Sequence, residues 1–487
     1  MKIQKNIIKI SSLIFFFIII FNTVYAKTTD KYNKSDKISN YFSGIISLYD
    51  NEYLTSYKHL KKLEGLEKNH LIYSQIYQHT LVNLKKFDKA YDFSKKIKNK
   101  NPNDFQSNLI IGLHYLKYRQ YKVASNYFQE LSRDTKQNNP LTNLLAISLN
   151  GWSIFPNIEK NEALNYLNKL PKNFGNVIKI QKTFAHCFYN SNNTQEEFIK
   201  LTSDKKTDFS RYNFFLANYM QRSSQVSEAI EIVKSSLNNY PKNLLLKQLF
   251  EDIKKKNNGK FSDKFNCQNP AHVVAEILYI ASNAMATQSA YQLSNFYLNL
   301  AMYLNSDFVS YKTLYAENFY MINSMENSKK IYKDIKNSGS VYKWHAAKQI
   351  SKILIKENDK EEAIKMLKIN FSEIASPTID QIYDYAEFLK NNEKYKQSIQ
   401  HYTKIINSIK EDHYLYPRAT DGRGVANERL GKWKKAENDF LNSLRIKPDQ
   451  PYVLNYLAYS WIEQGVKIEK SLDMIKKANE LKKMMAI

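Results

Sequence analysis

A pattern that recurs every 34 residues constrains this sequence more than any other feature. Segments that start at Lys37, Leu71 and Phe105 match place by place. The seventeenth place is aromatic in all three (Tyr53, Phe87, Tyr121), and the twentieth is small (Ser56, Ala90, Ala124). The eighth place reads Gly44, Gln78 and Gly112. Self-similarity at such a period indicates stacked structural units, none of which buries its apolar face alone.

Later segments keep the same pattern. Clear copies start at Ser210 and Pro417, weaker copies begin near Ala275, Val309, His345 and Ile379, and another starts at Pro451. Residues 139–170 and 175–201 fit the register poorly, but we expect a helical pair in each. The chain has only 11 glycines and 10 prolines in 487 residues, which is too few turn residues for an all-β or α/β protein. The sequence therefore predicts an all-α fold.

The repeat resembles the tetratricopeptide repeat (TPR), which has small residues at places 8 and 20 and large residues between them. Proline is frequent at place 32 of that repeat, where Pro102, Pro241 and Pro448 fall. Small side chains mark the points where the two helices of a unit cross closely. The resemblance implies an α-solenoid, a superhelix of about 11–12 TPR-like helix-turn-helix repeats, which binds other proteins.

The C-terminal half, from Ala275 through Trp461, is similar to a group of exported bacterial TPR proteins of unassigned role. In that group the array normally continues further. We expect either that the array is shortened at Ile487 or that this end docks on a partner.

The first 26 residues have the features of a secretory signal peptide. Three lysines precede the apolar run 13–21, and Val24 and Ala26 suit signal peptidase. A run this short does not span the roughly 30 Å of hydrocarbon in a membrane. We predict cleavage after Ala26 and a periplasmic location, with an uncleaved N-terminal anchor as the alternative.

The remaining chain divides at a segment rich in Lys, Asn and Gly. We expect an N-terminal tail at 27–36, an N-terminal TPR half at 37–254, a linker at 255–269 and a C-terminal TPR half at 270–487. The linker predicts two rigid arms with some relative freedom. No apolar stretch after the signal is long enough to span a membrane.

Cysteine placement and charge lead to two further expectations. Cys187 and Cys267 are more than one repeat apart in sequence, so in a regular solenoid they lie beyond bridging distance, and we expect two free thiols. The formal net charge is +25 at pH 7. The lysines are scattered in pairs, as on a solvated helix face, so we expect no nucleic-acid partner. An anionic envelope surface stays open as a partner.

The sequence carries no recognisable catalytic or metal-binding motif. Its nine histidines are never three or four residues apart, and no Cys-x-x-Cys occurs, so no helix presents a paired metal face. His186 and Cys187 are neighbours, but adjacent residues on a helix do not face each other. We predict that the protein is not an enzyme and has no cofactor. A site hidden in the irregular stretch 139–209 is the alternative.

In a TPR array the first helix of each unit lines the concave groove, with places 2, 5, 9, 12 and 13 pointing into it. These places give a polar candidate groove made of Arg211, Asn218, Arg222, Asn283, Glu317, Lys352, Glu387, Arg418, Asp421 and Glu428. The first three resemble the carboxylate clamp by which some TPR domains hold a peptide C-terminus. The clamp's usual lysines at place 5 are missing, and ordinary surface solvation is the alternative interpretation.

The leading hypothesis from these observations is a protein–protein interaction scaffold or adaptor in the bacterial cell envelope. Its concave groove would bind extended peptides or partner proteins. The alternative is a basic accessory factor that docks on anionic lipid, polysaccharide or cell wall during envelope assembly or export.

Overall fold

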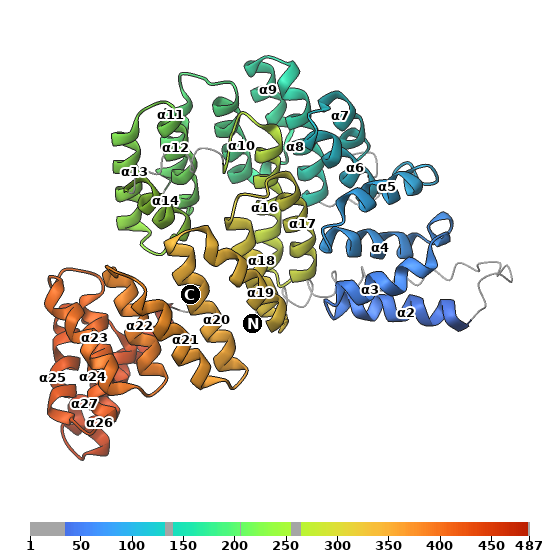
Figure 1. Ribbon diagram of the computed structural model, residues 1–487. Helices are drawn as coiled ribbons and strands as arrows, with labels where there is room; N and C mark the ends of the chain where they lie inside the picture. The colour runs from blue at the N-terminus through green and yellow to red at the C-terminus, as the bar shows by residue number, and fades with distance from the viewer. Residues whose placement is uncertain (1–34, 132–139, 205, 255–263, 486–487) are drawn as a thin grey trace. The chain divides into compact units, whose positions relative to one another are not determined.

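The computed structural model describes residues 35–131, 140–204, 206–254 and 264–485 (Figure 1). The predicted signal peptide and its cleavage site after Ala26 lie outside these residues. All regular secondary structure within them is helical, so the all-α prediction is confirmed. No helix among the described residues has the length and apolar character needed to cross a membrane.

The chain forms two compact units that divide between Ile111 and Gly112. The helices of the first unit are α2 (Ser35–Tyr49), α3 (Tyr53–Leu60), α4 (Leu71–Asn83) and α5 (Phe87–Lys98), and α6 (Phe105–Lys117) runs across the division. In this unit α2 packs on α3, α3 on α4, and α4 on α5. Sequential antiparallel packing of this kind is what a helix-turn-helix repeat predicts.

The second unit contains the remaining helices. Its first part consists of α7 (Tyr121–Glu130), α8 (Pro140–Ile154), α9 (Lys160–Tyr166), α10 (Gly175–Phe188), α11 (Thr194–Thr202), α12 (Ser210–Arg222), α13 (Val226–Asn239) and α14 (Leu244–Lys254). Helices α8 to α11 show that the two poorly fitting stretches do form helical pairs. The fully buried Trp152 and Phe155 fill the core where the first of these stretches departs from the repeat length.

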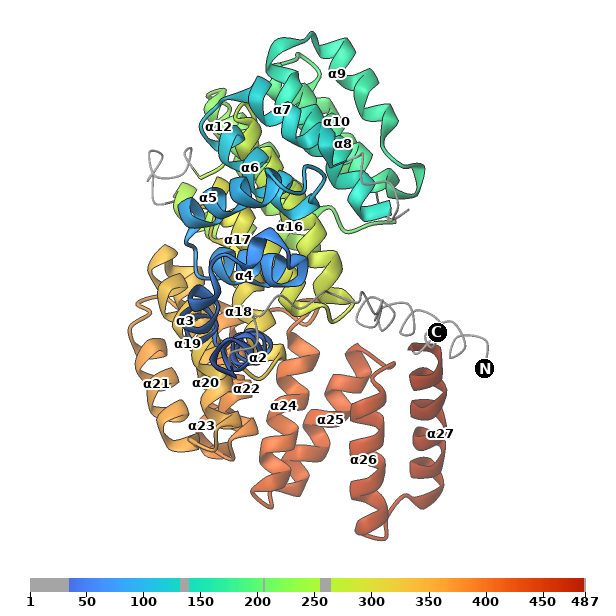
Figure 2. The same cartoon turned by 90° about the vertical axis from the view of Figure 1, so that its right-hand side faces the viewer.

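The second part of this unit begins after the expected linker. It consists of α16 (Pro270–Thr287), α17 (Tyr291–Leu304), α18 (Ser310–Met321), α19 (Met325–Ile335), α20 (Ser340–Lys356), α21 (Lys360–Ser372), α22 (Ile379–Asn391), α23 (Tyr395–Ser408), α24 (Tyr416–Arg429), α25 (Trp433–Ile446), α26 (Pro451–Glu463) and α27 (Ile468–Met485). From α22 onward, consecutive hairpins stack side by side (Figure 2). The helices of the described chain thus pair into hairpins, with α14 left over, and the solenoid prediction is confirmed.

The predicted small places are where the two helices of a hairpin touch. A methyl group added at Gly44 would lie 2.5 Å from Leu60, and one at Gly424 would lie 2.8 Å from the ring of Phe440. The hydroxyl of Ser56, at place 20, donates to the carbonyl oxygen of Gly44, at place 8, over 2.8 Å. Places 8 and 20 therefore set the spacing of the helices, as the sequence pattern predicts.

The turn between the two helices of a hairpin has its own recurring geometry. Place 15 has a left-handed backbone, with φ of 59° at Arg119, 63° at Ser224, 65° at Glu393 and 71° at Gly431. Only glycine adopts this conformation without a steric cost from its side chain. The repeat thus imposes the same turn on residues that do not favour it.

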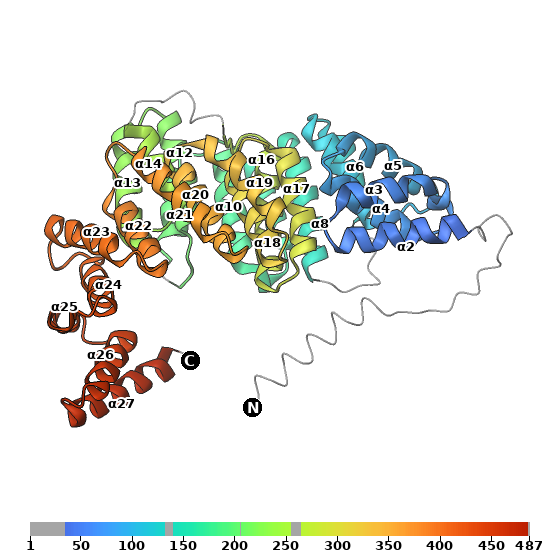
Figure 3. The same cartoon turned by 60° about the horizontal axis from the view of Figure 1, so that its bottom comes forward.

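The expected joint between two arms does not separate them. Helix α16 packs against α8, and α14 packs against α20, so the helices after the linker lie beside those before it (Figure 3). The amide oxygen of Gln248, on α14, accepts a hydrogen bond from the backbone N–H of Val341 over 2.9 Å. The described residues of 112–254 and 264–485 belong to one compact unit, and relative freedom between the two halves stays a prediction.

The expectation of free thiols is wrong. Cys187, in α10, and Cys267, just before α16, form a disulfide with their Cα atoms 5.9 Å apart. The expectation assumed a uniformly rising stack, in which distance along the sequence sets distance in space. Because α16 returns to α8, the segment 264–269 passes the end of α10 instead.

Candidate binding surface

The structure places Arg211, the first predicted groove residue, inside the protein. Its guanidinium donates to both carboxylate oxygens of Glu276, over 2.6 and 2.8 Å, and to the hydroxyl of Ser310 over 2.6 Å. The same group lies 4.0 Å from the ring centroid of Tyr279. The Glu276 side chain is fully buried. Arg211 is therefore engaged by α16 and α18, and its predicted role of holding a peptide carboxylate does not fit.

Asn218 and Arg222, on the same helix, also face the chain's own later segments. Asn218 is 3% exposed. Arg222 donates to the backbone oxygen of Phe265 over 3.1 Å. Arg211 and Arg222 thus hold one part of the chain against another, whereas Asn218 is buried on the same helix.

The next three predicted residues lie on three successive first helices. Asn283 on α16, Glu317 on α18 and Lys352 on α20 are all exposed. The ammonium group of Lys352 lies 4.7 Å from the ring centroid of Tyr320. These residues are accessible, and two of them interact: burial raises the pKa of Glu317, and the charge of Lys352 lowers it.

Helices α22 and α24 bring three of the predicted residues together. Glu387 accepts hydrogen bonds from the ammonium group of Lys390, over 2.8 Å, and from the hydroxyl of Tyr402. Arg418, exposed on α24, stacks its guanidinium 5.1 Å from the ring centroid of Tyr383 on α22. The two first helices thus present one continuous polar surface.

The charges of this surface act on one another. Burial raises the pKa of Asp421 to about 6, and the Glu387 carboxylate also raises it, while Lys390 and Arg418 lower it. Burial also raises the pKa of Tyr383, so its hydroxyl is protonated at neutral pH. Two carboxylates and two cations therefore share a half-buried area, which suits a ligand with both charges and hydrogen-bonding groups better than a simple polyanion.

Helix α26 extends the surface and makes it more apolar. Glu428, the last predicted residue, accepts a hydrogen bond from the hydroxyl of Tyr456 over 2.8 Å. Tyr452 and Tyr459, at places 2 and 9 of this unit, are 76% and 56% exposed. Exposed tyrosines supply large contact area with little loss of side-chain entropy, and they are enriched in protein-binding sites. We call the set Tyr383, Glu387, Lys390, Arg418, Asp421, Glu428, Tyr452 and Tyr459 the C-terminal surface.

Sequence reasoning missed half of this surface. Tyr383 and Lys390 occupy places 5 and 12 of the unit that starts at Ile379, and Tyr452 and Tyr459 occupy places 2 and 9 of the unit that starts at Pro451. The same place rule would have found them. Among the described residues, no group of three or more His, Cys, Asp or Glu side chains is placed to hold a metal ion.

Comparisons with known proteins add little to these observations. No protein-family model and no curated protein sequence matches the chain. A crystal structure of MamA is 15% identical, covers 35% of this chain and 96% of its own, and has a TM-score of 0.29. MamA from Desulfovibrio magneticus RS-1 is 12% identical over 36% of this chain and 96% of its own, with a TM-score of 0.29.

A further solved structure spans most of the chain. The crystal structure of the APC/C hetero-tetramer Cut9–Hcn1 is 10% identical, covers 92% of this chain and 94% of its own, and has a TM-score of 0.32. All these TM-scores are low, so the class of this protein rests on its own helices. The 34-residue register, the contacts at places 8 and 20 and the recurring turn at place 15 define an all-α helical repeat protein whose hairpins resemble tetratricopeptide repeats.

Proposed function

We propose that this protein is an interaction scaffold of the bacterial cell envelope that holds an extended peptide or a segment of a partner protein on the C-terminal surface. The observation that supports the proposal is the continuity of that surface across α22, α24 and α26. It combines mixed charge, half-buried carboxylates and exposed tyrosines on three first helices of a stacked array.

The packing behind the surface supports the same function. Tyr402 of α23 and Ala419 of α24 are fully buried in one core cluster. Phe440 of α25 and Trp461 of α26 are fully buried in the next. A rigid support keeps the groups that contact a ligand in place, which lowers the entropic cost of binding. The surface is therefore suited to binding without rearrangement.

The envelope location is supported by two features. The sequence pattern of residues 1–26 predicts export, and the Cys187–Cys267 disulfide fits a compartment in which disulfides persist, such as the periplasm. A scaffold in that compartment would meet its partners after their export.

The proposal is tested by crosslinking in cells from single positions. A photoreactive amino acid at Arg418 or Tyr459 should capture a defined partner. The same amino acid at Lys434, exposed on the second helix α25, is the matched control and should not capture that partner. Arg418→Ala and Tyr459→Ala should each weaken binding of the captured partner about tenfold or more.

Two results would contradict the scaffold function. One is capture of the same proteins with equal yield from Lys434 and from the C-terminal surface. The other is binding to anionic vesicles that disappears with added salt but is unchanged by Arg418→Ala and Tyr459→Ala, because that result identifies a docking factor for anionic surfaces.

A further inference from the structure

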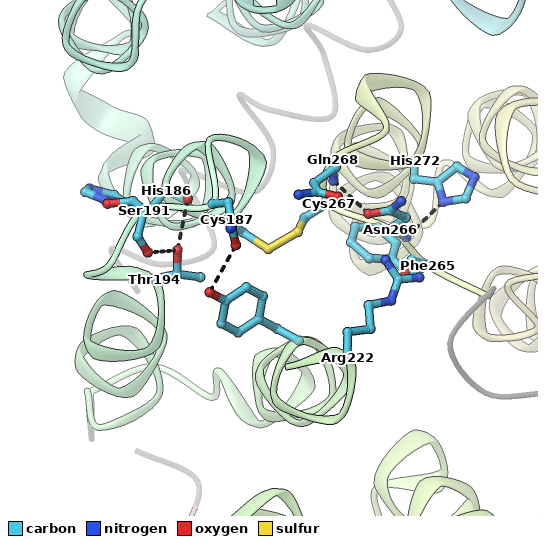
Figure 4. Close-up of a disulfide and its surroundings, with 12 residues drawn as sticks. His186, Cys187, Ser191, Thr194, Arg222, Phe265, Asn266, Cys267, Gln268 and His272 are labelled. Carbon is cyan, nitrogen blue, oxygen red and sulfur yellow. Dashed lines mark hydrogen bonds between the residues drawn. A yellow bond between two sulfur atoms is a disulfide. The ribbon is translucent and has the colours of Figure 1, made fainter. Parts of the chain in front are cut away.

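A pocket lies beside the disulfide, in a part of the second unit that the proposed scaffold function does not use. A cavity of about 280 Å³ is lined by residues of α10, α11, α12 and the segment 264–269. Figure 4 shows the disulfide beside it. A second cavity of about 400 Å³ shares Arg222, Asn266 and Gln268 with the first and reaches Arg119 and His272. Cavities of this size are at the lower end of the range for small-molecule sites.

The two cavities differ in character. The first is walled by the disulfide and by buried aromatic rings, including Phe198 and Phe215. The second is polar and has the exposed Arg119 and Arg222 at its edge. Pockets that combine an apolar wall with a few polar groups bind ligands that have both kinds of surface.

The polar cavity favours negative charge. Its described lining residues include two arginines and no aspartate or glutamate. It also lies at the N-terminal end of α16, whose dipole favours anions. The first N–H groups of that helix are already capped by Asn269, so the helix contributes its field rather than direct hydrogen bonds.

His272 adds a neutral hydrogen-bond donor to this cavity. Its Nδ1 accepts from the backbone N–H of Asn266 over 3.0 Å. Burial lowers the pKa of His272 to about 4, and the nearby Arg222 and Arg119 act in the same direction, against Asp307. The ring is therefore neutral at neutral pH, and the proton must be on Nε2 because Nδ1 is the acceptor.

An unpaired amide group in the first cavity points to a missing ligand. Asn218 lines this cavity and is 3% exposed, and its side-chain Nδ2 has no hydrogen-bond partner in the described chain. Buried donors are nearly always paired, because an unpaired one costs stability. A ligand with an acceptor atom next to Asn218 would supply the missing bond.

We propose that this pocket binds a small organic oxyanion with a ring-sized apolar group. Arg119 and Arg222 bind the carboxylate or phosphate, Asn218 donates to the ligand, and the apolar group packs against Phe198 and Phe215. The ligand site is distinct from the C-terminal surface. It is closed on one side by the segment that the disulfide holds in place.

The test uses the full chain with its disulfide intact and three probes: phenylacetate, phenyl phosphate and the neutral phenylacetamide. Binding is followed by saturation-transfer NMR and by the shift in the thermal unfolding midpoint. The two anions should bind and raise the midpoint, and the amide should not. Arg119→Gln should weaken anion binding about tenfold or more, because a charged hydrogen bond is lost.

Two matched variants separate a ligand site from a structural effect. Asn218→Leu keeps the approximate size of the side chain and removes its amide group, whose Nδ2 has no partner in the described chain, so it should weaken binding without lowering the midpoint of the free protein. Arg445→Gln, an exposed arginine paired with Glu411, should leave binding unchanged. The stronger of the two anions identifies the source, carboxylate or phosphate. Absence of binding by both at millimolar concentration, equal binding of the amide, or an equal effect of Arg445→Gln overturns the proposal.

Discussion

The buried ion pair between α12 and α16 makes the clearest quantitative prediction, because it joins the helices before and after the expected linker. Replacing Arg211 by Gln leaves Glu276 fully buried without its two charged hydrogen bonds of 2.6 and 2.8 Å. The remaining described donor to this carboxylate is the hydroxyl of Tyr311, 3.3 Å away. The substitution therefore strands a negative charge in the core.

The expected size of the effect follows from these contacts. Removing one partner of a buried ion pair costs about 3–5 kcal/mol. Loss of the stacking of Arg211 on Tyr279, 4.0 Å from the ring centroid, places the result toward the upper end. Arg211→Gln combined with Glu276→Gln leaves no buried charge, so the loss should fall to about 1–2 kcal/mol.

Hydrogen–deuterium exchange measured on peptides from α12, α16 and α18 reports this local stability directly. A loss of about 3–5 kcal/mol accelerates exchange by roughly two to four orders of magnitude in Arg211→Gln. Arg211→Lys keeps the charge but not the paired hydrogen bonds, and it should be intermediate. Exchange that accelerates less than about tenfold, or a double variant that exchanges faster than Arg211→Gln, would refute this reasoning.

Four further predictions concern the repeat, the disulfide and pH. Gly112→Ala should lower the free energy of unfolding, measured with urea, by about 1–3 kcal/mol, because the new methyl group overlaps the aromatic ring packed against it. Glu393→Gly should stabilise and Gly431→Ala should destabilise, each by about 1 kcal/mol in thermal unfolding, because both positions have φ near 70° (65° and 71°). Cys187→Ser should cost about 2–5 kcal/mol, and a reductant should lower the thermal midpoint of the wild type to that of the variant. Asp421→Asn should gain stability relative to the wild type as the pH rises from about 4 to about 7, because burial raises the folded-state pKa of Asp421 to about 6 from 3.8. The charge that forms across this window then destabilises the folded wild type.

Each of these predictions has a result that contradicts it. Equal stability of Gly112→Ala and the wild type would mean that place 8 does not set the helix spacing. Destabilisation by Glu393→Gly, or stabilisation by Gly431→Ala, would remove the steric argument for the turn. Insensitivity of the wild type to reductant would show that the disulfide does not stabilise the folded chain. A difference between Asp421→Asn and the wild type that stays constant with pH would show that Asp421 titrates as it does in water.

Part of the candidate surface could be read from the sequence. Glu387, Arg418, Asp421 and Glu428 were predicted from their places in the repeat, and the structure brings the first three together on α22 and α24. Whether they bind a partner stays a prediction. The left-handed turn at place 15 was not predicted from the sequence. Glycine is the residue that signals such a turn, and of the four place-15 residues whose φ is given above, only Gly431 is a glycine.

The sequence by itself determined the hairpins. The spacing of the two helices in a hairpin depends on small and large side chains that are close in sequence. The periodicity of the sequence predicts such short-range contacts. Only the tertiary structure decided where α16 lies. The disulfide between Cys187 and Cys267 and the pairing of Arg211 with Glu276 depend on rotations and irregular turns summed over several repeats. A small change at each step moves a distant segment by the width of a helix, and no local pattern records that sum.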